Sequence, residues 1–234
     1  MTVDDLVSNP PRLHIGPDGT PAGYAVSAGV LRYLDTVLES GQCTLETGAG
    51  VSTILFAMKG TRHTSIAPAA PLFERIRACL AESGLPGDGI TLVNERSEAY
   101  LPSLECEPLD LVLIDGRHAF PSPFIDWYYT EPHLKVGGLL LVDDTPIWTG
   151  RVLRDFLREA PEWESVTDIE GRTAVFRKLA DGGHQKFWPD QPFVVRRSNS
   201  TWPRVQAVAS ALLHGRLGEL RDMAHRYRAN RRRQ

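Results

Sequence analysis

The stretch that decides the fold is Leu109-Asp110-Leu111-Val112-Leu113-Ile114-Asp115-Gly116. Its centre, residues 111–114, is an uninterrupted apolar run, which is typical of a strand buried on both faces of a parallel sheet. The run ends in Asp115 and Gly116, an acid and a glycine that favour a turn. We therefore expect a central strand whose carboxyl end carries an acidic side chain.

Outward from this strand, short apolar runs alternate with helical patterns along the chain. Predicted strands cover 43–45, 63–66, 90–93, 109–114 and 139–142, and predicted helices cover 24–40, 52–59, 71–83, a short piece near Glu98, 122–134 and 150–158. This alternation predicts right-handed crossovers and a mostly parallel sheet covered on both faces. Two further predicted strands, 163–169 and 173–179, are joined by Glu170-Gly171-Arg172 and should form an antiparallel hairpin.

The predicted fold class is α/β: a Rossmann-like, doubly wound, mostly parallel sheet of seven strands that ends in an antiparallel hairpin. The core domain is expected over 24–180. Residues 1–23 are rich in proline and glycine and predict an irregular N-terminal arm. Residues 181–234 should add an aromatic loop and a basic amphipathic helix over 205–229, both packed on the same domain.

Composition bounds the class of protein. The 234 residues carry a formal net charge of −3, which gives no overall field to gather nucleic acid. The C-terminal arginines, including 231–233, favour a solvated helix face, while the apolar stripe of that helix favours a contact with the core or with a second copy of the chain.

Three widely spaced cysteines suggest reduced thiols, and neither a secretory signal nor a membrane-spanning stretch is evident. We expect a cytoplasmic protein that contacts no membrane.

A glycine loop follows the first predicted strand, in the segment Glu46-Thr47-Gly48-Ala49-Gly50-Val51-Ser52-Thr53. Glycines let the backbone approach a ligand closely, and the amides at the start of the next helix can face polar groups. The same glycines would also suit a simple tight turn. The dinucleotide-binding fingerprint needs a third glycine where this chain has Thr53, which weighs against a nicotinamide cofactor.

Three segments together resemble class I S-adenosylmethionine-dependent methyltransferases. The segment 46–52 is similar to the first motif of that family, with Ser52 in place of its last glycine. Residues 109–118 and 135–145 resemble the fourth and fifth strands of small-molecule O-methyltransferases of the catechol and macrolide-sugar type. The resemblance implies S-adenosylmethionine as cofactor, held by Glu46, Gly48, Ala49, Gly50, Ser52, Ser97, Glu98 and Asp115.

The same resemblance implies a metal site at the ends of the fourth and fifth strands. Its ligands would be Asp115, Asp143 and Asp144, and Mg²⁺ would be the metal. A hard divalent cation prefers several oxygens and would lower the pKa of a bound hydroxyl before methyl transfer. The alternative is structural: Asp143 or Asp144 caps the following turn, and Asp115 belongs to a tight turn.

His118 is the candidate general base: it lies just past the fourth strand, where the resemblance puts a residue facing the methyl donor or acceptor, and an imidazole there can take a proton near neutral pH. A hydrogen-bonded histidine in a turn is the alternative. Asp115 and Asp143 complete the predicted catalytic group. His14 and Trp148 are further candidates on the acceptor side.

The predicted function is methyl transfer from S-adenosylmethionine to a small-molecule acceptor, at a hydroxyl. One residue departs from the family pattern: Ala67 stands at or beside the position where the family has an acid that binds the cofactor ribose. Ser65, backbone or water could take over that role. Ala67 also motivates the alternative function, a methyltransferase-like protein that has lost catalysis and serves in binding or assembly.

Overall fold

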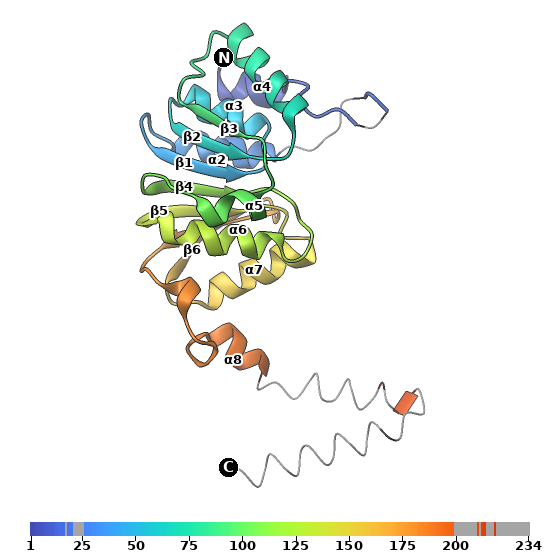
Figure 1. The fold of residues 1–234 in the computed structure, drawn as a ribbon, viewed down its shortest axis with the longest axis vertical. Coiled ribbons are helices and arrows are strands. Elements are labelled where there is room, and N and C mark those ends of the chain that lie inside the picture. Colours follow the sequence, from blue (N-terminus) through green and yellow to red (C-terminus); the bar gives the residue numbers. More distant parts are fainter. Residues whose placement is uncertain (17, 21–25, 199–209, 211, 214–217, 219–234) are drawn as a thin grey trace. The chain divides into compact units, whose positions relative to one another are not determined.

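The structure is a computed structural model that describes residues 1–16, 18–20, 26–198, 210, 212, 213 and 218. It divides into two compact units, Met1–Lys186 and Phe187–Gln234. The first unit holds a seven-stranded sheet with the strand order β3-β2-β1-β4-β5-β7-β6 (Figure 1). The predicted fold class is confirmed.

The strands fall into a parallel part and an antiparallel end. Their bounds are β1 Cys43–Thr47, β2 Arg62–Ile66, β3 Ile90–Val93, β4 Leu109–Ile114, β5 Leu134–Val142, β6 Trp163–Ile169 and β7 Thr173–Lys178. The first five pair in parallel, whereas β7 pairs antiparallel with both β5 and β6, which confirms the predicted hairpin. The strand order reverses between β1 and β4. Open α/β sheets bind ligands beyond the carboxyl ends of the strands at such a point.

The helices form two groups. They are α1 Val3–Ser8, α2 Ala28–Val37, α3 Val51–Met58, α4 Ala70–Glu82, α5 Ser97–Tyr100, α6 Ser122–Thr130 and α7 Trp148–Glu159, with short 3-10 turns η1 Leu101–Ser103, η2 Glu131–His133 and η3 Gly183–Gln185. Helices α1 to α4 contact one another, and α5 contacts α6, which contacts α7. The two groups lie on opposite faces of the sheet (Figure 1).

Strand β4 shows why the sheet needs both helical layers. Leu111 and Leu113 pack into the cluster that includes the buried residues of α1 to α4. Val112 and Ile114 are also buried, although successive side chains of a strand point to opposite faces. The apolar run therefore has no solvent-facing side, as the sequence predicted.

The N-terminal part differs from the prediction in two places. The arm over 1–23, predicted to be irregular, begins with α1, whose Thr2 and Asp5 form a capping box and whose Leu6 is buried. The predicted helix over 24–40 is shorter, because α2 ends at Val37. Gly41 has φ 83° and lies beyond the helix, in the turn that leads to β1.

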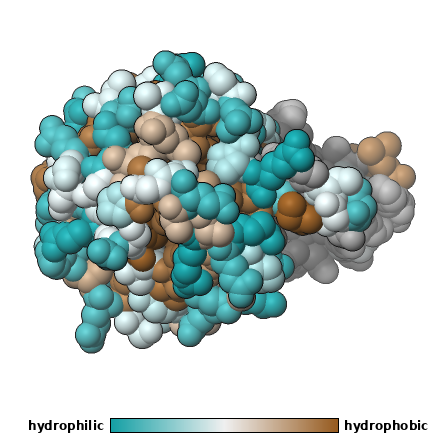
Figure 2. Space-filling view, turned by 90° about the horizontal axis from the view of Figure 1, so that it is seen from above, coloured by the Kyte–Doolittle hydropathy of each residue, from teal (hydrophilic) through white to brown (hydrophobic). Residues whose placement is uncertain are grey.

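Within the second unit the structure describes η4 Trp188–Asp190 and α8 Pro192–Ser198. The amphipathic helix predicted over 205–229 lies outside the described residues, apart from four isolated positions. Among the described residues, no helix combines the length and the apolar character needed to span a bilayer. Figure 2 shows a face on which hydrophobic residues lie between hydrophilic ones.

Candidate functional site

A pocket of about 690 Å³ lies where the carboxyl ends of the central strands meet. Its lining combines the glycine loop after β1, the residues after β2, the start of α5, the loops after β4 and β5, and the turn of the β6–β7 hairpin. Pockets of this size hold small ligands and cofactors. The pocket therefore lies at the point where the strand order reverses.

Gly48 allows the ends of three strands to converge beside this pocket. Its φ is 101°, a left-handed conformation that favours glycine, and its amide donates to the Ile66 carbonyl over 2.9 Å. A Cβ built there would lie 2.4 Å from the carbonyl oxygen of Asp115. A side chain at this position would therefore push the ends of β1 and β4 apart.

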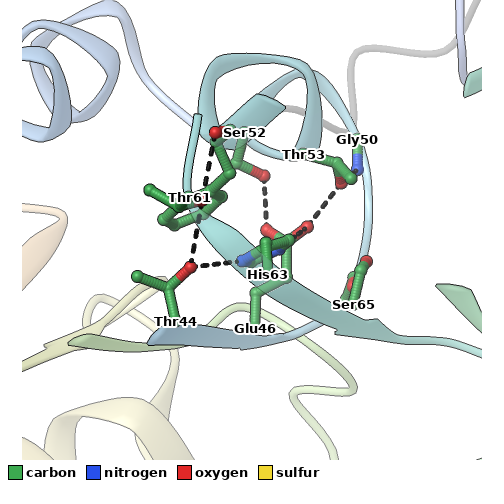
Figure 3. A network of polar contacts seen from close by, with 10 residues as sticks. Thr44, Glu46, Gly50, Ser52, Thr53, Thr61, His63 and Ser65 are labelled. Carbon is green, nitrogen blue, oxygen red and sulfur yellow. Dashed lines mark hydrogen bonds and ion pairs between the residues drawn. The ribbon is translucent and has the colours of Figure 1, made fainter. Parts of the chain in front are cut away.

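The remainder of the loop is anchored by a buried polar network around Glu46 (Figure 3). Ser52 Oγ donates to Glu46 Oε2 over 2.6 Å, and Thr53 Oγ1 donates to Glu46 Oε1. The amide of Gly50 in turn donates to Thr53 Oγ1 over 3.0 Å. His63 Nε2 lies 3.2 Å from Glu46 Oε1. The carboxylate thus ties the helix start to β2.

Three of the predicted cofactor residues, Glu46, Gly50 and Ser52, do not line the pocket. Glu46 and Ser52 are 1% and 3% exposed and do not line the pocket, because their side chains bond to each other inside the core. Five of the other predicted cofactor residues do line it: Gly48, Ala49, Ser97, Glu98 and Asp115. The role of Glu46 is to hold the loop.

The wall expected to face the cofactor ribose is apolar. Ser65 is fully buried, and its hydroxyl donates to the Gly48 carbonyl over 2.9 Å, so this side chain is already engaged. Ile66, Ala67, Pro68 and Ala69 line the pocket beyond it. No acid stands at the end of β2.

The N-terminal segment supplies His14 to the same pocket. A Cβ built on Gly50 would lie 2.9 Å from His14 Nε2, which places the imidazole against the glycine loop. Burial lowers the pKa of His14, so the ring favours its neutral form. His14, predicted on the acceptor side, therefore lies next to the glycine loop, where the cofactor is expected.

The acids at the ends of β4 and β5 do not all point the same way. Asp115, His118 and Asp144 each offer one ligand atom within 4.8 Å of the others, and all three line the pocket. Asp143 does not line it; its Oδ1 accepts a hydrogen bond from Thr173 in the core. Of the predicted ligands Asp115, Asp143 and Asp144, the first and the last face the pocket, and His118 lies with them.

Asp144 is held in an unusual conformation between two basic side chains. Its φ is 50°, in the left-handed region that non-glycine residues visit rarely and mainly at functional sites. Its Oδ2 lies 2.9 Å from His118 Nε2, and its Oδ1 lies 2.9 Å from Arg172 Nε. A Cβ on Gly150 would lie 2.8 Å from the Asp144 carbonyl oxygen, so that glycine lets α7 approach.

The geometry now permits comparison with known proteins. Residues 45–145 match a sequence family described as a methyltransferase domain. This span begins in β1 and ends just after Asp144, so it contains the glycine loop and all three predicted acids. The resemblance read from the motifs is confirmed.

Several solved structures share the fold of this chain. The cofactor-bound Rv0187 from MTB is 21% identical, with 68% of this chain and 84% of that chain covered and a TM-score of 0.58. The O-methyltransferase TomG from Streptomyces achromogenes, involved in tomaymycin synthesis and in complex with SAM, is 19% identical, with 76% and 91% covered and a TM-score of 0.58. The SAH-bound methyltransferase PaMTH1 from Podospora anserina is 17% identical, with 70% and 83% covered and a TM-score of 0.53. No functionally curated protein matches the chain.

Sequence reasoning did not single out Arg172 or Asp126 as residues of this site. Arg172, in the hairpin turn outside the matched span, lines the pocket beside Asp144. Asp126, on the aromatic helix α6, is fully buried beneath Thr47, Ser97 and Gly116, all of which line the pocket. In the sequence, Asp126 gave no local signal other than its charge within an apolar helix.

Burial perturbs two of the carboxyl groups. Desolvation, followed by the nearby Asp143 and Glu46, raises the pKa of Asp115 well above its usual range. Desolvation also raises the pKa of Asp126 to about 6, while Ser97 and Thr47 partly offset the rise. Both carboxyls therefore favour the protonated form more than an exposed aspartate does.

We expect Asp126→Asn to stabilise the protein at alkaline pH. The folded pKa of about 6 lies above the unfolded value of 3.8, so the folded state binds the proton more tightly. The wild-type protein therefore loses stability as pH rises through the folded pKa of Asp126. The difference between the folded and unfolded pKa values corresponds to at most about 3 kcal/mol. Urea denaturation should show the variant gaining on the wild type between about pH 4 and about pH 7. Asp88→Asn, at an exposed loop position, is the matched control, and a pH-independent difference would contradict the expectation.

Proposed function

We propose that this chain is an S-adenosylmethionine-dependent methyltransferase that methylates a hydroxyl group of a small molecule. The observation that carries the proposal is a single pocket that joins the glycine loop after β1 to the His118–Asp144 pair after β4 and β5. One end of the pocket suits a cofactor and the other offers a base. Two of the structural neighbours are described as bound to SAM or SAH, and one of these as an O-methyltransferase.

The cofactor end of the pocket fits the proposal. Backbone at Gly48 and Ala49 is open to a ligand, the wall over 66–69 is apolar, and Ser97 and Glu98 supply polar groups at the far side. When bound, S-adenosylmethionine would supply the sulfonium methyl group. The protein's part is to hold the methyl donor in line with the acceptor and to exclude water.

The acceptor end provides a base. His118 Nε2 is engaged by Asp144, which leaves Nδ1 as the nitrogen that would take the acceptor proton. Asp144 would then stabilise the imidazolium that forms, as the acid does in nucleophile–histidine–acid triads. Thr149 Oγ1 donates to the His118 carbonyl over 2.5 Å, so the start of α7 fixes the backbone of this base.

Two exposed aromatic side chains lie close in sequence to the residues of the acceptor end. Phe120 and Trp148 are 69% and 56% exposed, and their ring centroids lie 6.4 Å apart. Phe120 lies two residues after His118, and Trp148 directly precedes Thr149; His118 and Thr149 are the two residues joined by the hydrogen bond described above. Exposed aromatics beside a polar pocket suit an acceptor with an apolar or planar body. Trp127, by contrast, is buried and packs edge-on against Phe156 in the core.

Calorimetric titration with S-adenosylmethionine and its demethylated product tests the cofactor assignment. We expect micromolar dissociation constants for both and a raised melting temperature, since ligands that bind the folded state stabilise it. A screen of hydroxylated small molecules with methyl-labelled donor then tests the reaction. If a folded sample binds neither compound at millimolar concentration, the alternative of a non-catalytic binding protein, motivated by Ala67, is favoured. A response to a nicotinamide dinucleotide alone would revive a dehydrogenase-like function.

The apolar wall over residues 66–69, which is expected to face the cofactor ribose, yields a sharper prediction: a gain in affinity for the cofactor. Ala67→Asp should place a carboxylate where the pocket has none, and hydrogen bonds from the ribose hydroxyls to a charged acceptor should tighten cofactor binding by about tenfold, or ~1.4 kcal/mol. Ala81→Asp, at an exposed position of α4, adds the same charge away from the pocket and should leave affinity unchanged. Unchanged or weaker binding by Ala67→Asp would place the ribose elsewhere.

A further inference from the structure

The turn of the β6–β7 hairpin holds a cation at the methyl-transfer site. The Arg172 carbonyl accepts hydrogen bonds from Thr145 N over 2.9 Å and from Thr145 Oγ1 over 2.8 Å. The Arg172 amide donates to the Ile169 carbonyl over 3.0 Å. The backbone of Arg172 is thus clamped to the residue that directly follows Asp144. This clamp directs the guanidinium to the acids at the end of β5.

The guanidinium contacts both acids at the end of β5. Arg172 Nε lies 2.9 Å from Asp144 Oδ1, and Arg172 Nη2 lies 3.6 Å from Asp143 Oδ2. The second oxygen of each acid is also engaged, Asp144 Oδ2 by His118 and Asp143 Oδ1 by Thr173. A divalent cation at these acids would have to compete with the charge of Arg172, and at Asp144 also with His118. Two of the three predicted magnesium ligands, Asp143 and Asp144, are therefore already paired with a cation, which disfavours a metal at these acids.

We propose that Arg172 is the resident cation of this site: it occupies the carboxylates on which a divalent metal would depend, and it orients Asp144 toward His118. Arg172 is then a positioning residue, which acts on the base through Asp144. Guanidinium suits this task because it stays charged and its planar donors match a carboxylate. The catalytic consequence, methyl transfer without a divalent metal, rests on the proposed function, whereas the exclusion of metal does not.

Metal titration of the full chain tests the exclusion directly. Wild-type protein should show no Mg²⁺ binding by calorimetry and no Mn²⁺ binding by electron paramagnetic resonance below millimolar concentration. Arg172→Gln removes the cation and leaves the acids, so Mn²⁺ affinity should rise at least about tenfold. Arg172→Lys keeps a positive charge and should keep most of the exclusion. Arg177→Gln, which removes an exposed arginine paired with Glu164 on the same hairpin, should gain nothing.

Two outcomes would overturn the proposal. One is a wild-type protein that binds Mg²⁺ or Mn²⁺ at micromolar concentration, which requires no variant to fold. The other is a folded Arg172→Gln variant, judged by circular dichroism, with wild-type metal affinity. A gain of affinity cannot arise from a merely structural role, because local unfolding would weaken a site rather than create one. Neither readout depends on cofactor binding, so failure of the proposed function would leave this test intact.

Discussion

Replacement of Glu46 by alanine is expected to lower the free energy of unfolding by about 3–5 kcal/mol, because removing one partner of a buried pair leaves the other uncompensated. Glu46 and His63 are each 1% exposed, so neither can turn to water. Ser52 and Thr53 would also lose the acceptor of their hydroxyl hydrogen bonds. Urea denaturation monitored by circular dichroism measures the loss.

A double-mutant cycle separates the pair from general damage to the core. The costs of Glu46→Ala and His63→Ala should not add, because either substitution alone already breaks their contact. Glu74→Ala, at an exposed position of α4, should change stability by no more than about 0.5 kcal/mol. Additive costs for Glu46 and His63 would mean that the 3.2 Å approach contributes nothing.

A conservative substitution at the same position, Glu46→Gln, should weaken cofactor binding. Glu46→Gln retains an acceptor but not the charge, so the fold should survive while the glycine loop loosens. Thr53 connects the two, since its hydroxyl donates to Glu46 and accepts from the amide of Gly50 (Figure 3). A folded Glu46→Gln protein with wild-type affinity for S-adenosylmethionine would show that the loop needs no such anchor.

The fold was predictable because its signals are local. The apolar run over 109–114 and the Glu170-Gly171-Arg172 turn each specify a strand type without reference to the rest of the chain. The boundaries predicted for β4 and β6 agree with the structure, whereas β5 begins at Leu134, before the apolar run over 139–142. Gly137 and Gly138 hid the start of that strand, since glycine has no side chain to carry an apolar pattern.

Side-chain partners were less predictable, because they depend on register between strands. Glu46 was assigned to the cofactor by its place in the loop motif, yet the parallel register pairs Thr44 with His63 and so brings the imidazole beneath Glu46. Arg172 was read only as a turn residue. Its pairing with Asp144 arises because β7 lies antiparallel beside β5, so the start of β7 meets the end of β5. No local pattern encodes that approach.

His118→Ala should reduce the turnover number for methyl transfer by about 10²–10⁴-fold, the usual contribution of a positioned base. The substitution removes the imidazole but spares the bond from Thr149, which reaches the His118 carbonyl, so the loop should remain in place. Cofactor affinity should change little, because the glycine loop and Ser97 lie on other elements. The measurement is transfer of a labelled methyl group to the acceptor found by screening, with His133→Ala, away from the pocket, as control. If His118→Ala kept wild-type turnover, the proton would have to leave by another route, and the contact between His118 and Asp144 would be structural rather than catalytic.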